Sequence, residues 1–469
     1  MGKRRQTRCP SCEQLRRDVA ALQAQVRQLQ EKLAEAQKNS STSSKPPSSD
    51  IVKPAQPAAD PDTGPRQPGG QPGHAKHERP LIPPELLQSS HNHVLACCPD
   101  CGHDLEPTEQ PPRIIQQIDI DLREIPVHAE EHRAYGGFCP HCRRYHQAAL
   151  PESIARGGLV GPRLTTLIAY LKGVCHASFS TIRKFLRDVV GVTLSRGQLA
   201  KVIGKVSQAL QGPYEELLQR LPDEAALNVD ETGHKENGLR MWTWCFRASL
   251  YTVFHIDPRR SGDVLLEVLG EEFEGVLGCD YFSAYRRYMR ECGIIVQFCL
   301  AHLIRDVKFL LTLPDKRDRA YGERLCVGLR QLFGVIHRRD EMGARRFRAE
   351  LRGAKEAILR VALEEVPPTR HSMTLAQRFE KHGEAYFTFL TSPGVEPTNN
   401  VAEQASRFVV LDRQVTRGTR GEAGRRWCER IWTVMATCCQ QGRSVFTFLS
   451  DAVQAWMLGE PAPSLEPMS

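Results

Sequence analysis

Residues Ala225-Ala226-Leu227-Asn228-Val229-Asp230-Glu231-Thr232 decide the fold of the central part of this 469-residue chain. They form a short apolar run that ends in two carboxylates, which predicts a buried strand with acidic side chains at its end. Residues 239–250, which alternate in part between apolar and polar, and residues 251–256 predict the second and third strands.

A helix and a fourth strand follow along the chain. Apolar residues recur at helical spacing within residues 261–273, and residues 275–280 form another short apolar run, which ends in Asp280. Three strands, a helix and a strand beside the first is the order of a ribonuclease-H-like core. In that order the first and fourth strands are neighbours, so we expect Asp230 and Asp280 to face each other across one gap.

A third carboxylate belongs to the stretch Glu396-Pro397-Thr398-Asn399-Asn400-Val401-Ala402-Glu403. Pro397 and Thr398 predict a helix start, which places Glu403 in the first turns of that helix. The spacing from Asn400 to Glu403 is also that of a capping box, in which the glutamate only satisfies a backbone N–H. The two strand-borne aspartates favour a functional role for Glu403 over that alternative.

Three carboxylates suit the hydrolysis of a phosphodiester. Two Mg²⁺ ions about 3.5–4 Å apart activate a water and stabilise the leaving oxygen. Because Mg²⁺ is a hard ion with oxygen ligands, Asp and Glu are the residue types required. We expect Asp230 to bridge both ions, with Asp280 on one and Glu403 on the other. The alternatives are that Asp230 caps a strand and that Asp280 is a turn residue.

The N-terminal residues 1–38 predict a CxxC pair and a short coiled coil. Apolar residues alternate at steps of four and three, a heptad seam made of Leu15, Val19, Leu22, Val26, Leu29 and Leu33. The alternative is an amphipathic helix that packs on its own protein. Cys9 and Cys12 alone are weak support for a metal site. Residues 39–80 are rich in Ser, Pro and Gly and predict a disordered linker.

Two CxxC pairs lie within residues 81–150, with Cys98 and Cys101 in the first and Cys139 and Cys142 in the second. Four thiolates make a tetrahedral site suited to one structural Zn²⁺. Because the stretch between the pairs alternates as strands do, we predict a zinc ribbon. The alternative is four unrelated thiols.

Residues 151–220 predict helices, with an order that resembles a helix-turn-helix. Ser195 and Gln198 have capping-box spacing at the start of one helix. Four residues of this helix are expected to be available to DNA, namely Arg196, Gln198, Lys201 and Lys205. An ordinary helical hairpin is the alternative.

The remainder of the chain completes a multidomain α+β and α/β organisation. Residues 221–302 are the first part of the core, residues 303–390 a basic helical insertion, residues 391–455 the last part of the core, and residues 456–469 a flexible tail. For Cys299 and His302, which supply only two ligands, a structural or DNA-positioning role is preferred over a metal site. Basic residues after Glu403 suit a polyanionic substrate and include Arg407, Arg413 and Arg417.

Composition is consistent with a nucleic-acid partner. The formal net charge is +8, although a basic surface is often only a solvated face. The N-terminus has no apolar run of the secretory type, and no apolar stretch is long enough to span a bilayer. We therefore expect a soluble cytoplasmic protein, in which the 16 cysteines are thiols, core residues or metal ligands.

The motifs together resemble transposases of the insertion-sequence-66 family. The resemblance covers most of residues 15–449 in family order and includes Val229-Asp230-Glu231-Thr232, the stretch from Asp280 to Tyr285, Cys299-Leu300-Ala301-His302 and the stretch from Glu396 to Glu403. Gln404 stands where the family usually has arginine, and Leu300 where an aromatic residue is usual.

The resemblance implies a DDE recombinase with Asp230, Asp280 and Glu403 as its triad, using two Mg²⁺ or Mn²⁺ ions. Asn399, Asn400, Cys299 and His302 belong to the shared motifs as supporting residues. It also implies binding to terminal inverted repeats and to target DNA, small accessory proteins of the same element as partners, and a nucleoid-associated location in a bacterium. The coil predicts a homo-oligomer.

The expected reaction has two in-line steps in one site. A water cuts at the element's end and releases a 3′-hydroxyl, which then attacks target DNA. Two rival hypotheses stay open: a nuclease or resolvase with the same triad that never joins strands, and a non-catalytic zinc-dependent DNA-binding regulator.

Overall fold

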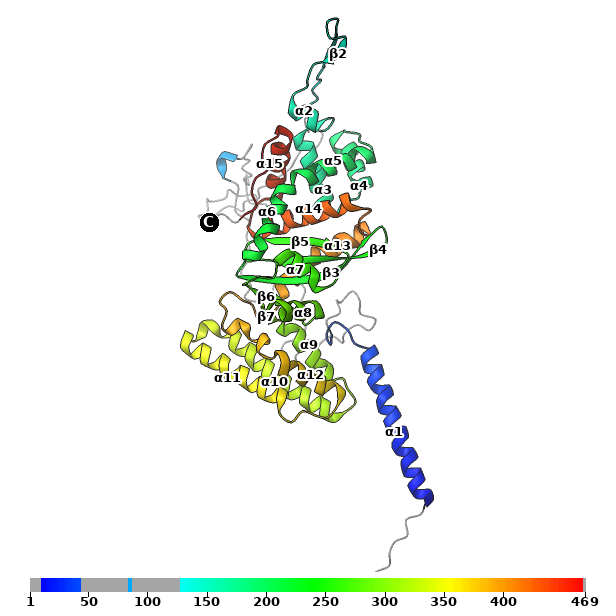
Figure 1. The fold of residues 1–469 in the computed structure, drawn as a ribbon, viewed down its shortest axis with the longest axis vertical. Helices are drawn as coiled ribbons and strands as arrows, with labels where there is room; N and C mark the ends of the chain where they lie inside the picture. Colours follow the sequence, from blue (N-terminus) through cyan, green and yellow to red (C-terminus); the bar gives the residue numbers. More distant parts are fainter. Residues whose placement is uncertain (1–9, 44–82, 87–126, 467–469) are drawn as a thin grey trace, which may run out of the picture. The chain divides into compact units, whose positions relative to one another are not determined.

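The computed structural model describes residues 10–43, 83–86 and 127–466 (Figure 1). The described residues of 1–54 and 130–469 belong to one compact unit, and the described residues between 55 and 129 belong to another. The N-terminal elements are α1 (Pro10–Ala36), the short η2 (Pro84–Leu86), and an antiparallel hairpin of β1 (Gly136–Cys139) and β2 (Arg144–Gln147). The strands predicted between the CxxC pairs fall largely outside the described residues.

A five-stranded mixed sheet forms the centre of the larger unit. Its strands are β3 (Ala226–Glu236), β4 (Leu239–Arg247), β5 (Thr252–Asp257), β6 (Val276–Cys279) and β7 (Ile295–Phe298), in the order β5-β4-β3-β6-β7. Strands β3, β4 and β5 pair antiparallel, whereas β3 pairs parallel with β6 and β6 with β7. Helix α7 (Gly262–Leu269) connects β5 to β6, and helix α8 (Ser283–Cys292) connects β6 to β7. The predicted adjacency of the first and fourth strands is confirmed, and the sheet is compatible with a ribonuclease-H-like core.

Strand β3 is longer than the sequence predicted. Its second half is polar and was not predicted as strand, but it pairs along its whole length with β4. The two strands are joined at Asn237 and Gly238, which both have positive φ angles, 49° and 82°. Asn-Gly is the favoured pair for such a tight hairpin turn, since its twist matches that of the strands.

The outer edge of β5 is covered by helix α14 (Glu422–Gln440). Three side chains of α14, all fully buried, accept the backbone N–H groups that β5 turns away from β4. Glu429 bonds to Ile256 N (2.7 Å), Thr433 to Phe254 N (3.0 Å) and Thr437 to Thr252 N (3.2 Å). The spacing of the three helix residues matches that of the three strand residues, because four residues of a helix rise about 6 Å and two residues of a strand about 6.6 Å.

The region before the sheet is helical, as predicted. It contains α2 (Glu152–Gly157), α3 (Pro162–Gly173), α4 (Phe179–Phe185) with the π-helical η4 (Leu186–Val190), α5 (Arg196–Ala209), α6 (Gln211–Arg220) and η5 (Leu221–Asp223). The predicted capping box is confirmed: Ser195 and Gln198 bond reciprocally at the start of α5. The apolar face of α5 packs on α3, α14 and α15 (Val445–Leu458).

The predicted helical insertion is also present. Its elements are α9 (Leu300–Leu310), α10 (Lys316–His337), η6 (Arg339–Glu341), α11 (Ala344–Leu363), α12 (Arg370–His382), η7 (Glu384–Tyr386) and η8 (Thr388–Leu390). Helices α10, α11 and α12 pack side by side (Figure 1). Elements η7 and η8 lie against β7, where the Gln297 side chain bonds to Tyr386 O (3.0 Å) and Phe389 N (2.8 Å).

Residues 427–449 form an apolar stretch whose sequence predicts a single helix, but the structure has two helices there. Helices α14 and α15 are separate, because Gly442 adopts a left-handed φ of 67° and Ser444 caps α15. Helix α15 continues to Leu458, and Leu465 is fully buried. The described part of the segment expected to be a flexible tail, residues 456–466, therefore begins as helix and contains a packed side chain. No helix among the described residues combines the length and apolarity needed to cross a membrane.

Candidate active site

Strand register brings Asp230 and Asp280 to the same level of the sheet. Asn228 on β3 pairs with Gly278 on the parallel β6, and Asp230 and Asp280 each follow two positions later; the two are close enough that the charge of Asp280 raises the pKa of Asp230. A Cβ atom built on Gly278 would lie 2.5 Å from the Asn228 side-chain nitrogen, so this close approach requires glycine. Asp280 leaves the strand at once and accepts the Phe282 N–H at 2.8 Å.

Helix α13 (Asn400–Thr416) is bonded to β3 through the residue before its first turn. Asn399 is buried; its Nδ2 donates to Val229 O at 2.7 Å, and its Oδ1 accepts from Asn228 Nδ2 at 2.9 Å. Its backbone N–H also lies 3.1 Å from Cys299 Sγ. These contacts place the first turn of α13, which carries Glu403, beside the residue that precedes Asp230.

The capping-box alternative for Glu403 does not describe this helix. The N-cap residue is Asn399, no side chain caps the helix, and Asn400 is the exposed first helical residue. The Glu403 carboxylate instead faces the side chains of α9, with Oε1 3.7 Å from His302 Nδ1 and Oε2 3.7 Å from an Arg305 nitrogen. Asn400 therefore lies at the edge of this arrangement, and its neighbour Asn399 is the residue that the fold uses.

The three carboxylates influence one another electrostatically. Burial raises the pKa of Asp230 well above its usual value, and the charges of Glu231, Asp280 and Glu403 raise it further. Burial also raises the pKa values of Asp280 and Glu403. A bound divalent cation relieves such repulsion and favours the ionised forms. Because Glu403 Oε1 is buried without a hydrogen-bond partner, the residues present fit a cation.

A fourth carboxylate, Glu231, follows Asp230 on β3, and the sequence did not indicate a role for it. Its side chain is buried and accepts from Arg260 (Nη2 at 2.6 Å) and from the Tyr285 hydroxyl. Burial raises its pKa to about 7. The Arg260 guanidinium lies 4.4 Å from the Trp242 ring centroid and 4.1 Å from that of Phe282. Arg260 sits in the loop after β5, where no periodic pattern draws attention to it.

Cys299 and His302 lie beside Glu403, closer to the site than the sequence indicated. Cys299 is the N-cap residue of α9, and His302 is in the first turn of that helix. A ligand atom from each of Cys299, His302 and Glu403 lies within 4.8 Å of the other two. Arg305, one turn after His302, contacts both His302 Nε2 (3.3 Å) and Glu403; the sequence analysis did not single it out.

The residues predicted to contact DNA from α5 lie at its start and along one side. Arg196 and Lys201 are exposed, and Arg196 donates to Ser180 Oγ at 2.7 Å. Gln198 is engaged in the capping box. The Lys205 ammonium donates to Gly157 O at 2.7 Å and is half-buried, so part of this set serves the packing of the helices.

The basic residues predicted after Glu403 differ in their surroundings. Arg407 is exposed on α13, one turn beyond Glu403. Arg413 is half-buried and donates to Thr232 Oγ1 at 3.1 Å, which ties α13 to β3. Arg417 is the exposed C-cap residue of α13, in the left-handed conformation.

The predicted zinc ligands are only partly within the described residues. Cys98 and Cys101 lie outside them. Cys139 ends β1, and the exposed Cys142 lies in the turn that leads to β2. The second CxxC pair thus occupies a hairpin turn, which is where a zinc knuckle would place it.

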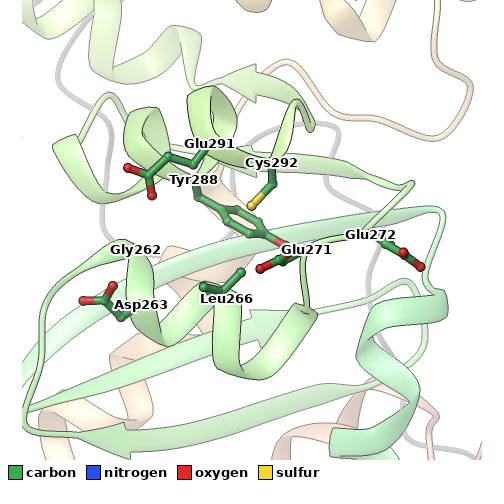
Figure 2. A pocket seen from close by; sticks show the side chains of 8 residues that line it. All are labelled: Gly262, Asp263, Leu266, Glu271, Glu272, Tyr288, Glu291 and Cys292. Carbon is green, nitrogen blue, oxygen red and sulfur yellow. The ribbon is translucent and has the colours of Figure 1, made fainter.

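A cleft elsewhere on the unit, of about 420 Å³, lies between α7 and α8 (Figure 2). Its lining includes four carboxylates, from Asp263, Glu271, Glu272 and Glu291. Such a lining repels phosphates. The cleft contains none of the three predicted catalytic carboxylates, so it is not the candidate active site.

Comparison with known proteins identifies the family of this chain. A family model described as "Transposase IS66 family" matches residues 157–426, which is more than half of the chain. A second model, a family of unknown function (DUF6444), matches residues 5–80. None of the curated proteins matches. The matched residues include the sheet, the three carboxylates and the helical insertion, and the chain therefore belongs to the IS66 family of transposases.

Proposed function

We propose that the chain cuts the 3′ ends of its mobile element and joins them to target DNA in a single site formed by Asp230, Asp280 and Glu403. The observation that carries this proposal is the attachment of α13 to β3 through Asn399. That attachment adds a helix-borne carboxylate to two strand-borne ones, and the pKa of Asp230 is raised in part by both of the others.

The three side chains are the proposed ligands of two Mg²⁺ or Mn²⁺ ions. When bound, such ions activate a water or hydroxyl and stabilise the leaving oxygen of an in-line displacement. The carboxylates would fix the ions' position, since Asp230 lies within β3, Asp280 directly follows β6 and Glu403 lies on the first turn of α13. Arg260, held against Glu231, adds a cation near Asp280 that suits a phosphate.

Each step exchanges one P–O bond for another. Water attacks the phosphorus at the element end and loses a proton, the bond to the 3′-oxygen breaks, and the released 3′-oxygen takes up a proton to become a hydroxyl. That hydroxyl then attacks a target phosphodiester, loses its proton and displaces the target's 3′-oxygen. No serine or tyrosine nucleophile of the protein is required.

Two N-terminal modules complete the proposal. The α1 seam is exposed along its length, from 48% at Val19 to 64% at Leu29, which favours a homo-oligomer formed through a coiled coil. A zinc ribbon formed by Cys98, Cys101, Cys139 and Cys142 and the α5 residues would assist binding to the inverted repeats. Accessory proteins of the element and association with the nucleoid belong to the same proposal.

A joining assay tests the chemistry. A pre-cut element end is incubated with target DNA and Mg²⁺, and the joined product is measured for the wild type and for Asp230→Asn, Asp280→Asn and Glu403→Gln. We expect joining by the wild type and none by the three variants, each with retained DNA binding and circular dichroism. Glu396→Gln, at an exposed position in the loop before α13, is the matched control and should join normally.

Two outcomes would replace the proposal. If the wild type hydrolyses an intact element end but never joins strands, the protein is a nuclease or resolvase. If the wild type binds DNA without either reaction, and Glu403→Gln keeps its biological role, the protein is a regulator.

A further inference from the structure

Three metal-binding side chains of different chemistry meet at the start of α9. Cys299 is the N-cap of this helix, His302 lies in its first turn, and Glu403 comes from α13. Their ligand atoms lie within 4.8 Å of one another. In a tetrahedral zinc site, with bonds of about 2.0–2.3 Å, ligand atoms are separated by about 3.3–3.8 Å. Small side-chain movements are therefore enough to close the three around one ion.

Two of the atoms lack hydrogen-bond partners. His302 Nδ1 and Glu403 Oε1 are both buried and unpaired, and the 3.7 Å between them is too long for a hydrogen bond. Buried polar atoms without a partner are uncommon in folded proteins. The His302 side chain faces Glu403. Because His302 is only 7% exposed, little solvent reaches it.

Arg305 occupies the place of a competing cation. Its nitrogens lie 3.3 Å from His302 Nε2 and 3.7 Å from Glu403 Oε2. Because arginine only donates hydrogen bonds, Nε2 is the acceptor, and a neutral ring then carries its proton on Nδ1. A metal bound at Nδ1 requires the other tautomer, with the proton on Nε2. Arg305 must then turn away, so Arg305 and the metal are alternatives.

We propose that Cys299, His302 and Glu403 form a site for a thiophilic divalent cation of the Zn²⁺ class, distinct from the proposed Mg²⁺ sites. The thiol and imidazole select against Mg²⁺, which prefers oxygen ligands. Binding displaces Arg305, releases the thiol proton and leaves the one proton of the neutral ring on Nε2.

Occupancy of this site withdraws Glu403 from Asp230 and Asp280. The cation therefore inhibits strand joining, and Mg²⁺ does not relieve the inhibition readily, since it competes poorly for a thiolate. This inhibitory part rests on the proposed function, whereas the binding part does not.

Binding is measured first, with the full-length protein and Co²⁺ as the probe. Thiolate-to-cobalt absorption reports sulfur ligation, and equilibrium dialysis gives the number of ions bound. Because the predicted ribbon cysteines also bind Co²⁺, the comparison is between variants. We expect Cys299→Ser and His302→Asn each to lose one bound ion of those bound by the wild type. Cys292→Ser, a half-buried thiol at the end of α8, is the control and should lose none.

Arg305→Gln sharpens the test. Removal of the competing cation should tighten Co²⁺ binding at this site by about tenfold, the scale of outer-shell effects on metal affinity. Unchanged stoichiometry in both Cys299→Ser and His302→Asn, with thermal melting that shows both folded, would overturn the site. So would weaker binding by Arg305→Gln.

Inhibition is measured separately, as the ratio of joined product with and without Zn²⁺. We expect a large reduction for the wild type and a ratio near one for Cys299→Ser, whatever its activity without Zn²⁺. If Zn²⁺ binds but the two ratios are equal, the inhibitory part is wrong. If the wild type never joins strands, the proposed function fails while the cobalt result still stands.

Discussion

The side-chain amide of Asn399 donates to the backbone carbonyl of Val229 at 2.7 Å, across 170 residues of chain. Val229 immediately precedes Asp230, and Asn399 immediately precedes helix α13. One buried amide therefore sets the distance between a strand-borne aspartate and a helix-borne glutamate. Asn228 completes the contact by donating to the other side of the same amide.

Asn399→Ala should abolish joining activity and lower the free energy of unfolding by about 1–3 kcal/mol, because it leaves Asn228 and the Val229 carbonyl without their buried partner. Asn400→Ala is the matched control, since Asn400 is exposed; it should change stability by less than about 0.5 kcal/mol. Joining assays and urea denaturation measure the two effects. Equal behaviour of the two variants would show that the contact does not position α13.

Gly278→Ala tests the close approach of β3 and β6. The added methyl group would lie 2.5 Å from Asn228 Nδ2 and would push that amide away from Asn399. We expect destabilisation of about 1–3 kcal/mol by overpacking, together with a loss of activity. Gly204→Ala, in helix α5 with open space around it, should instead be neutral or stabilising, by up to about 1 kcal/mol. Thermal melting compares the two, and a neutral Gly278→Ala would contradict the argument.

His234 makes stability depend on pH. Burial, together with the charges of Arg413 and Arg425, lowers its pKa from 6.5 to about 4. Between these values the unfolded chain binds a proton that the folded protein does not, so stability falls as the pH drops from about 6.5 to about 4. The loss attributable to this residue is on the order of 3 kcal/mol across the window.

The measurement is the difference between the wild type and His234→Gln in the pH dependence of the unfolding free energy. The difference is needed because Glu231, whose pKa is raised to about 7, has the opposite effect: its stabilising contribution is lost as the pH rises towards 7. A variant with the same slope as the wild type below pH 6.5 would show that His234 does not carry the effect.

The α1 seam should control the oligomeric state. Leu22→Glu with Leu29→Glu places two charges on the apolar seam and should convert the full-length oligomer to a monomer, measured by light scattering after gel filtration. Ala21→Glu with Gln28→Glu adds the same charges on another, exposed side of the helix and should leave the oligomer intact. Monomeric wild-type protein at micromolar concentration would contradict the prediction.

The sequence predicted the sheet well because its strands contain short apolar runs followed by turn residues or carboxylates, as at Asp280. In β3 the apolar run ends at Asp230, although the strand continues to Glu236. The sequence also predicted the helix that carries Glu403, because Pro397 and Thr398 are local signals of a helix start. Arg260 and Arg305 could not be found in this way. Their roles depend on partners far along the chain, such as Glu231 for Arg260 and Glu403 for Arg305.

Two other differences between the prediction and the structure have causes of their own. Asn400 rather than Asn399 suited a capping box by spacing, but burial against β3 decided which asparagine the fold uses. The break between α14 and α15 rests on the left-handed conformation of Gly442; a lone glycine in an apolar stretch is compatible with a continuous helix.

The ladder of Glu429, Thr433 and Thr437 along β5 has a consequence for how copies of this protein meet. Exposed strand edges are templates for intermolecular β-pairing and fibre growth. Here one outer strand has its N–H groups occupied by a helix of the same chain, and η7 and η8 lie against the other. Edge-to-edge pairing between the sheets of two copies is therefore disfavoured at both outer strands.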